Sequence, residues 1–212
     1  MKPYYEQDGI TIYHGDCREV LPTLERVDLV LTDPPYGKQY ARGKNGIGAG
    51  GRFNLDSVSW DKKAPDVAMV EEITSKASKS IVWGCNHIGG LPSTNCFLIW
   101  DKQNGKNVYA DAEVAWSNLT ITTRIFRKQW IGGSITEHIS HPTQKSLDLM
   151  KWCIELAGDV QTILDPFMGS GTTLRAAKDL GRKAIGIEIE ERYCEIAANR
   201  LAQGVLFGVD NA

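Results

Sequence analysis

The fold is decided by one stretch of the sequence, Thr162-Ile163-Leu164-Asp165-Pro166-Phe167-Met168-Gly169-Ser170-Gly171-Thr172-Thr173. An apolar run ends at an acid, a turn with two glycines follows, and the next residues have helical spacing. Glycines let a ligand approach the backbone, and the free amides at a helix start attract negative charge. We therefore expect a strand over 162–165 and a helix over 172–180 that is capped by threonine, with a ligand-binding turn between them.

An acid in the next predicted strand, 184–188, indicates what this ligand contains. Glu188 ends that strand 17 residues after Gly171, close to the spacing at which nucleotide-binding folds place an acid for ribose hydroxyls. Thr172 and Thr173 stand where a Walker loop would have its lysine, and Leu174 follows where a dinucleotide motif would have its third glycine. The pattern predicts an adenosine-containing ligand, although the glycines alone would equally fit a plain turn.

Predicted strands and helices alternate along the whole chain. We expect further strands over 11–13, 28–32, 80–83 and 96–100, and helices over 17–26, 65–78, 143–156 and 190–201. Residues 112–116 and 120–126 resemble an antiparallel pair joined near Asn118. This alternation predicts an α/β fold with a mostly parallel, doubly wound sheet and an antiparallel edge.

Length and composition limit the class of protein. The 212 residues, 42% apolar and 24% charged, predict one domain over 1–212. No apolar run reaches the roughly 18 residues of a membrane span, and the start lacks a secretory signal, so a cytoplasmic protein without a membrane partner is expected. The five cysteines are scattered and predict reduced thiols. A net charge of -2 argues against a protein that coats nucleic acid, but it leaves room for a local basic face.

Two segments are candidates for that face. Residues 37–63 hold six glycines and a charge of +4, which predicts a mobile basic loop that contacts phosphates. Residues 101–140 are a candidate target-recognition segment. Among their basic, amide and aromatic residues, those proposed to read the target are Lys102, Asn104, Lys106, Asn107, Arg124, Arg127, Lys128 and Trp130. Ordinary solvated charges on an edge strand explain this second set equally well.

Asp33-Pro34-Pro35-Tyr36 follows directly on the predicted strand 28–32. The amino group of a nucleobase is a poor nucleophile because its lone pair is delocalised, and hydrogen bonds to both amino hydrogens can free that pair. Asp33 offers a carboxylate and Pro34 a carbonyl, while the prolines stiffen the loop and withhold amide donors. Tyr36 offers a flat face for a base taken out of its stack. Alone, the tetrapeptide would also fit a strand that ends in a proline turn.

Together with His141-Pro142-Thr143-Gln144-Lys145, these motifs make the chain resemble the β-class amino-methyltransferases of DNA. In that class the catalytic motif precedes the cofactor motif, as it does here. The resemblance covers Gly15 to Glu188 and implies a Rossmann-like methyltransferase fold in circularly permuted order, S-adenosylmethionine as cofactor and double-stranded DNA as partner. We expect residues near Asp16 to pack beside Glu188. Ser146 departs from the family, which usually has a proline after the lysine.

The resemblance also implies a role for each motif residue. Thr143 and Lys145 are expected at the cofactor carboxylate, and Asp16 and Cys17 near its adenine. The remaining cofactor residues are expected to be Asp165, Phe167, Gly169, Ser170, Gly171, Thr172 and Glu188. The catalytic residues are expected to be Asp33, Pro34, Pro35 and Tyr36.

The expected chemistry is direct in-line transfer of a methyl group without a metal or a covalent enzyme intermediate. No Pro-Cys occurs, which disfavours methylation of cytosine carbon 5, and His138 and His141 have only Glu137 beside them, which disfavours zinc. An acid in the first position of the tetrapeptide favours N6 of adenine. An N4-cytosine enzyme, an RNA amino-methyltransferase and an inactive DNA-binding module of the same fold stay open, as do a homodimer and a cognate restriction endonuclease as a separate protein.

Overall fold

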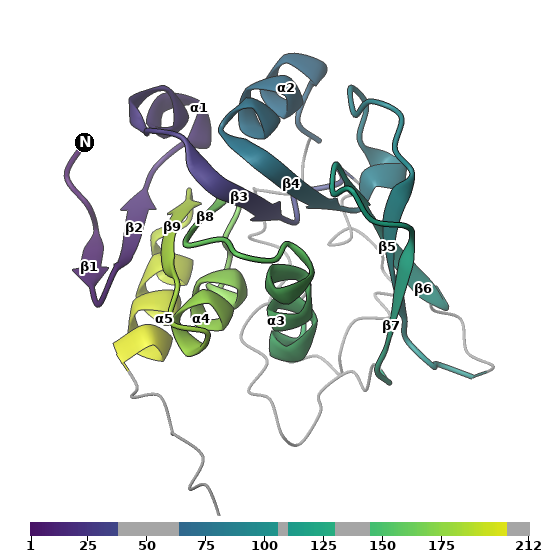
Figure 1. Ribbon diagram of the computed structural model, residues 1–212. Helices are drawn as coiled ribbons and strands as arrows, with labels where there is room; N and C mark the ends of the chain where they lie inside the picture. Colours follow the sequence, from purple (N-terminus) through teal and green to yellow (C-terminus); the bar gives the residue numbers. More distant parts are fainter. Residues whose placement is uncertain (38–63, 106–109, 130–144, 203–212) are drawn as a thin grey trace, which may run out of the picture.

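A nine-stranded sheet runs through the part of the chain that the computed structural model describes, residues 1–37, 64–105, 110–129 and 145–202 (Figure 1). Its order is β1-β2-β9-β8-β3-β4-β6-β5-β7. The strands are β1 Tyr5–Gln7, β2 Ile10–His14, β3 Val27–Thr32, β4 Ala77–Trp83, β5 Cys96–Asp101, β6 Ala112–Ser117, β7 Arg124–Arg127, β8 Thr162–Asp165 and β9 Lys183–Glu188. The helices are α1 Cys17–Val20, α2 Val67–Ser75, α3 Leu147–Leu156, α4 Thr172–Asp179 and α5 Glu191–Ala202.

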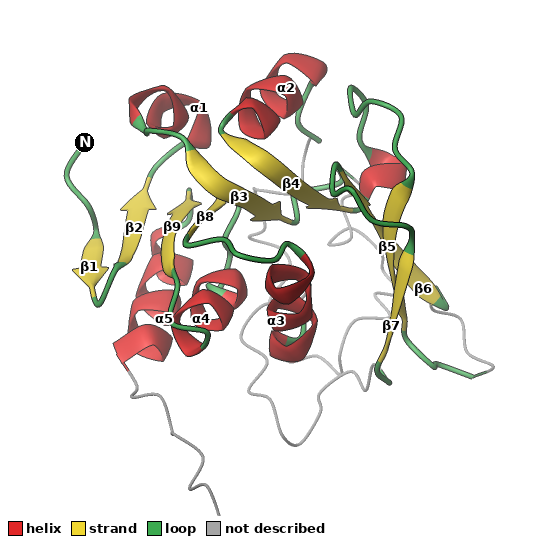
Figure 2. Cartoon of the chain, viewed as in Figure 1, coloured by secondary structure: helices red, strands yellow, loops and turns green. Residues whose placement is uncertain are grey.

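Helices cover both faces of the sheet. Helices α1 and α2 lie over one face, and α3, α4 and α5 lie over the other (Figure 2). The five strands β2, β9, β8, β3 and β4 are parallel to one another. Because both faces are covered, such strands are apolar almost throughout: Leu29, Val30 and Leu31 of β3 have no exposed surface. The expected α/β fold with a doubly wound, mostly parallel sheet is confirmed.

The first and last strands of the parallel group lie side by side, although they are far apart in the chain. Strand β2 pairs with β9 in a register that sets His14 opposite Glu188. The amide of Gly15 donates to the carbonyl of Glu188 at 2.9 Å. The expectation that residues near Asp16 pack beside Glu188 is therefore confirmed, and with it the permuted order of the motifs.

The antiparallel edge exists, but the strand pairing predicted for it is wrong. Strand β6 pairs with β4 on one side and β5 on the other, and β7 runs parallel to β5. Strand β5 therefore separates β6 from β7. The Asn118 side chain accepts from the amide of Ser80 at 2.7 Å and donates to the carbonyl of Ser78 at 3.0 Å, which ties the end of β6 to β4. Asn118 therefore links β6 to β4 through its side-chain amide, and it does not form the hairpin turn to β7 that the sequence predicted.

Three helices are shorter than their sequence patterns predict. The segment expected as helix 17–26 is α1 and then a 3₁₀ turn, Leu21–Thr23, because Pro22 cannot continue an α-helical ladder. Helix α2 ends at Ser75, since Ala77 already pairs with Val27 in the sheet. Helix α3 begins only at Leu147, and its cap explains the unusual Ser146: the hydroxyl accepts from the Leu149 amide at 3.2 Å.

The glycine turn before α4 has a different cap from the one expected. Gly171, not a threonine, is the N-cap residue, and its φ of +76° lies in the left-handed region that favours glycine. A Cβ at this position would lie 2.8 Å from the Cβ of Ala197 on α5. Thr172 is already helical, and its hydroxyl accepts from Arg200 at 3.0 Å. Close packing of α5 therefore requires glycine here.

All five cysteines are free thiols, and Cys17, Cys96, Cys153 and Cys194 are buried. This agrees with the prediction of reduced thiols. Among the described residues, no helix has both the length and the apolar character needed to span a bilayer.

Asp28 clamps the amino ends of β3 and β8, which share only two registered residue pairs. Its Oδ2 accepts from the amides of Gln161 and Thr162 and from the Thr162 hydroxyl, each at 2.9 Å. We expect Asp28→Ala to lower the free energy of unfolding by about 1 to 2 kcal/mol at pH 7, measured by urea denaturation. The matched control is Asp159→Ala, which removes an exposed bond to the Gln161 side chain and should cost less than about 0.5 kcal/mol.

This loss should depend on pH. The Gln161 amide and the other donors hold the pKa of Asp28 below its ordinary value. A carboxyl whose pKa is lowered by folding stabilises the protein above its unfolded pKa of about 3.9, and the contribution is lost as the pH falls further. The difference between wild type and Asp28→Ala should therefore shrink toward pH 3. A difference that is equal at pH 7 and pH 3 would contradict this account.

Candidate functional site

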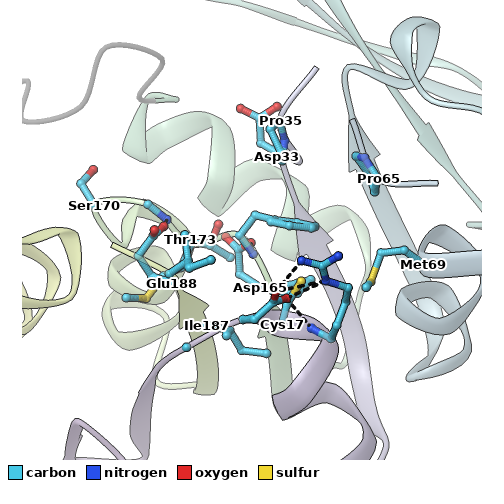
Figure 3. A pocket seen from close by; sticks show the side chains of 18 of the residues that line it. Cys17, Asp33, Pro35, Pro65, Met69, Asp165, Ser170, Thr173, Ile187 and Glu188 are labelled. Carbon is cyan, nitrogen blue, oxygen red and sulfur yellow. Dashed lines mark hydrogen bonds and ion pairs between the residues drawn. The ribbon is translucent and has the colours of Figure 1, made fainter. Parts of the chain in front are cut away.

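A cavity of about 390 Å³ opens at the carboxyl ends of the parallel strands. Figure 3 shows that Asp33 and Pro35 lie at one side of this cavity, while Ser170 and Glu188 reach it from the glycine turn and β9. Carboxyl ends of parallel strands are where α/β folds bind their ligands. The expected site residues that line it are Asp16, Cys17, Asp33, Pro35, Lys145, Asp165, Phe167, Gly169, Ser170, Thr172 and Glu188.

The remaining expected residues take other places. Pro34, Tyr36 and Gly171 are not part of the cavity lining, and Thr143 lies outside the described residues. Gly171 lies in the turn but packs against Ala197 of α5. Tyr36 instead contacts Asp33 directly, as described below.

Glu188 closes the glycine turn with both of its carboxyl oxygens. Oε2 accepts from the amide of Gly169 at 3.0 Å, and Oε1 accepts from the amide of Glu190 at 2.8 Å. Burial raises the pKa of Glu188 to about 7, although these amide donors oppose the rise. A carboxyl of this kind, fixed at the cavity wall, can accept hydrogen bonds from ligand hydroxyls.

Asp165 joins the glycine turn to the strand that carries the tetrapeptide. Its Oδ1 accepts from the hydroxyl of Thr32 at 2.8 Å and from the amide of Phe167 at 3.2 Å. Burial raises the pKa of Asp165 to about 6. The side chain thus holds the carboxyl ends of β3 and β8 together and fixes the first residue of the turn.

Asp16 and Cys17 form the wall contributed by β2 and α1. The Asp16 carboxylate caps α1 through the amide of Arg18 at 3.0 Å, and the Arg18 guanidinium pairs with it. The hydrogen bond from Arg18 holds the pKa of Asp16 below its ordinary value. Burial raises the pKa of Cys17 to about 11, so this thiol is protonated at neutral pH and serves as apolar wall.

Both carboxyl oxygens of Asp33 already have donors. The Tyr36 hydroxyl donates to Oδ1, and the Lys145 ammonium donates to Oδ2. Burial raises the pKa of Asp33, and the charge of Lys145 opposes this rise. The Tyr36 ring lies 5.1 Å from the ring of His87, centroid to centroid, in a tilted arrangement. Asp33 is thus a fixed acceptor beside an aromatic face, and it faces the same cavity as the glycine turn.

Lys145 joins the tetrapeptide to a strand of the antiparallel edge. Its Nζ lies 2.9 Å from Oε2 of Glu113, in β6, as well as against Asp33, and only 7% of its side chain is exposed. Burial by itself would lower the pKa of Lys145, but the charges of Asp33 and Glu113 outweigh this effect and raise the pKa above its ordinary value. The group therefore stays charged. The predicted contact of Lys145 with a cofactor carboxylate stays a prediction, and the residue does line the cavity.

The sequence patterns missed several residues of the site. Pro65, Asp66 and Met69 at the start of α2 line the cavity, as does Met150 of α3. Pro65 and Asp66 fit a plain helix start, and Met69 and Met150 fit core residues, so no sequence signal separates them. Glu113 did carry a signal, because strand alternation puts it on the same face as the fully buried Ala115.

Several residues named in the sequence analysis lie outside the described part of the chain. These are His138 and His141, all but Gly37 of the loop 37–63, and residues 106–109 and 130–140 of the candidate target-recognition segment. In the described part of that segment, Lys102 is buried against Glu113 and does not belong to a surface. Arg127 pairs with Asp101 at 3.6 Å, and Lys128 pairs with Asp148 at 2.7 Å.

Comparison with known proteins places this chain among DNA methylases. The DNA methylase family that joins N6 and N4 methyltransferases matches residues 52–199. The Type II methyltransferase M.ScaI of Streptomyces caespitosus is 28% identical over 94% of this chain and 84% of its own length. M.HinfI of Haemophilus influenzae is 30% identical over 91% of this chain and 68% of its own length. The DNA adenine methyltransferase YhdJ of Escherichia coli is 26% identical over 93% and 84%.

Solved structures agree with the fold. The crystal structure of the M1.HpyAVI–SAM complex is 25% identical, with a TM-score of 0.63 over 92% of this chain and 100% of that one. The PvuII DNA methyltransferase, described as cytosine-N4-specific, has the same TM-score over 100% of this chain and 91% of that one. At 15% identity, the PvuII enzyme supports the fold alone.

Gly84, which follows β4, makes room for the Tyr36 ring. Its φ is +68°, and a Cβ there would overlap the ring. Gly181 has a similar φ of +69° but nothing within 4 Å of its would-be Cβ. Both Gly→Ala variants should lose about 1 to 2 kcal/mol of unfolding free energy from backbone strain, and Gly84→Ala should lose at least about 1 kcal/mol more. Urea denaturation measures both, and the excess should disappear when Tyr36→Ala is combined with Gly84→Ala.

Proposed function

Because the chain belongs to the DNA methylase family of N6-adenine and N4-cytosine methyltransferases, we propose that it transfers a methyl group from S-adenosylmethionine to the N6 amino group of adenine in duplex DNA. One observation carries the proposal: the Asp33 carboxylate faces the same cavity as the glycine turn and Glu188. An acceptor for an amine and a turn for an adenosine-containing ligand are thus parts of one site.

The cavity suits this cofactor in its size and in the chemistry of its walls. Glu188 supplies a carboxylate for ribose hydroxyls, and the turn from Phe167 to Ser170 lets a ligand approach the backbone. Met69 and the protonated Cys17 supply apolar walls for an adenine ring. When bound, S-adenosylmethionine supplies an electrophilic methyl carbon on a cationic sulfur.

The residues of the chain activate and orient the amine. Asp33 accepts a hydrogen bond from one amino hydrogen and the Pro34 carbonyl from the other, which frees the nitrogen lone pair. Tyr36 provides the face against which the extruded base stacks. As the amine accepts the methyl group, it would lose one proton along its hydrogen bond to Asp33. Positioning and electrostatics then provide the rate, without a metal or covalent enzyme intermediate.

Adenine is preferred over cytosine on two grounds. The first position of the tetrapeptide is an acid, Asp33, and the relative YhdJ is named a DNA adenine methyltransferase. A homodimer and a separate cognate restriction endonuclease remain proposals for its partners.

The test is a labelling experiment with matched substrates. The protein is incubated with tritiated S-adenosylmethionine and unmethylated duplex DNA, single-stranded DNA or RNA, and the labelled base is identified by mass spectrometry. We expect N6-methyladenine in duplex DNA. Label on N4 of cytosine or in RNA would replace the proposed target, and no label on any substrate would remove the proposed activity.

The variant Asp33→Ala should abolish this transfer but keep the dissociation constant for the cofactor within about tenfold, because the carboxylate activates the amine more than it holds the cofactor. Calorimetry with S-adenosylmethionine measures binding. Asp148→Ala, which removes an exposed partner of Lys128, is the control and should keep both properties. If Asp33→Ala also loses cofactor binding, the role given to Asp33 is wrong.

Cofactor affinity should rise with pH through about 7. The raised pKa of Glu188 means that the group is largely protonated at pH 6 and largely ionised at pH 8. Ribose hydroxyls donate better to the ionised form, which also attracts the sulfonium. The dissociation constant should therefore be up to about tenfold larger at pH 6 than at pH 8. Glu188→Gln should bind more weakly and show a flat profile over this range, and a slope unchanged in that variant would assign the titration elsewhere.

A further inference from the structure

Four charged side chains form a chain of ion pairs at the edge of the cavity, in the order Asp33, Lys145, Glu113 and Lys102. Their exposed side-chain fractions are 21%, 7%, 26% and 11%, so the two ammonium groups are the more buried members. A buried ammonium is costly unless it has a carboxylate partner. Lys145 has two such partners, one from the tetrapeptide and one from β6.

The topology explains how β6 supplies the second partner. Strand β6 is antiparallel to β4, so its first residues lie at the edge where the parallel strands end. Glu113 is the second residue of β6 and stands opposite Trp100 of β5, whose carboxyl end delivers Lys102. An antiparallel strand thereby brings an acid to the edge at which Asp33 lies.

The two carboxylates hold Lys145 differently. Its ammonium donates a hydrogen bond to Oδ2 of Asp33. Oε2 of Glu113 is buried and forms an ion pair with the same nitrogen at 2.9 Å. Glu113 is therefore a second carboxylate partner for an ammonium that also donates to Asp33.

The target amine must share Asp33 with the donors that already bind it. Tyr36 donates to Oδ1 of Asp33 and Lys145 donates to Oδ2, so an incoming amino group competes with these donors for the carboxylate. Lys145 also borders the face on which the base would stack, with its nitrogen 6.0 Å from the centroid of the Tyr36 ring. Displacement is feasible only if the buried ammonium keeps a partner.

We propose that Glu113 is a positioning residue of the transfer reaction, which takes over the hydrogen bond of Lys145 when the target amine binds to Asp33. The inference depends on the proposed function, because it assigns Asp33 to the amine. Lys102 pairs with Glu113 throughout and keeps this carboxylate in place. Glu113 acts through Lys145 and does not line the cavity, so it should leave the cofactor untouched.

The first test compares Glu113→Gln with wild type on unmethylated duplex DNA that contains the sequence in which the labelling experiment finds the methyl group. The single-turnover rate of the preformed complex with cofactor and DNA should fall by about 10- to 100-fold, because Lys145 then competes with the amine for Asp33. The dissociation constant for S-adenosylmethionine should stay within about threefold. The control Asp179→Asn removes a carboxylate that is 9% exposed and pairs with both Lys151 and Arg175, and it should keep the wild-type rate within about twofold.

The second test asks whether Glu113 acts through Lys145. In a double-mutant cycle, Glu113→Gln combined with Lys145→Met should be as fast as Lys145→Met alone, within about twofold. Independent losses that multiply would overturn the inference. So would a Glu113→Gln protein with the wild-type rate, or one whose lower rate accompanies a loss of cofactor binding.

Different results would exclude the proposed methyl transfer and the proposed role of Glu113. A wild-type protein that labels no nucleic acid removes the proposed function itself. A wild type that is active and loses transfer in Asp33→Ala, but keeps it in Glu113→Gln, removes only the role of Glu113.

Discussion

The parallel pairing of β3 with β8 is the constraint on which the whole site depends. These strands come from distant parts of the chain and share only two registered pairs, Leu29 with Ile163 and Val30 with Leu164. Side chains reinforce this short contact at both ends, through Asp28 at the amino ends and through Asp165 with Thr32 at the carboxyl ends. Because the strands are parallel, the residues that follow them meet at one edge. The tetrapeptide that begins at Asp33 and the glycine turn thus become neighbours at the same cavity.

The charges of the site follow from burial at that edge. Asp165 is buried and Asp33 and Glu188 are partly buried, and this burial raises the pKa of each. Backbone amides donate hydrogen bonds to the carboxyl groups of Asp165 and Glu188. Asp33 instead accepts its hydrogen bonds from the side chains of Tyr36 and Lys145. Hydrogen bonds from fixed amides cannot be exchanged, but an ammonium on a long side chain can change partners. In the proposed reaction, this difference suits a carboxylate that accepts a new donor in each turnover.

The antiparallel edge adds to the site as well as ending the sheet. Its strands reverse direction beside β4, so that β6 starts where the parallel strands stop. One acid at the start of such a strand can therefore reach a site built by parallel strands. Together with the turn at Gly84, which leaves room for the Tyr36 ring, this edge supports the tetrapeptide, while residues at the carboxyl ends of β2, β8 and β9 line the cavity.

The sequence by itself determined the class of fold, the cofactor turn, the tetrapeptide and the order of the motifs, because each is local: an apolar run, a turn residue and a helix start stand next to one another in the chain. It also predicted that Asp16 would lie beside Glu188, since the permuted order implies which strands adjoin. It failed for the pairing of β6 and β7, because a strand has two edges and its pattern does not say which neighbour takes each. Only the tertiary structure showed that Lys102 is buried, that Lys145 lies between two carboxylates and that Glu113 is one of them. Those contacts join residues from separate elements, and the packing of the sheet edge decides which charges meet there.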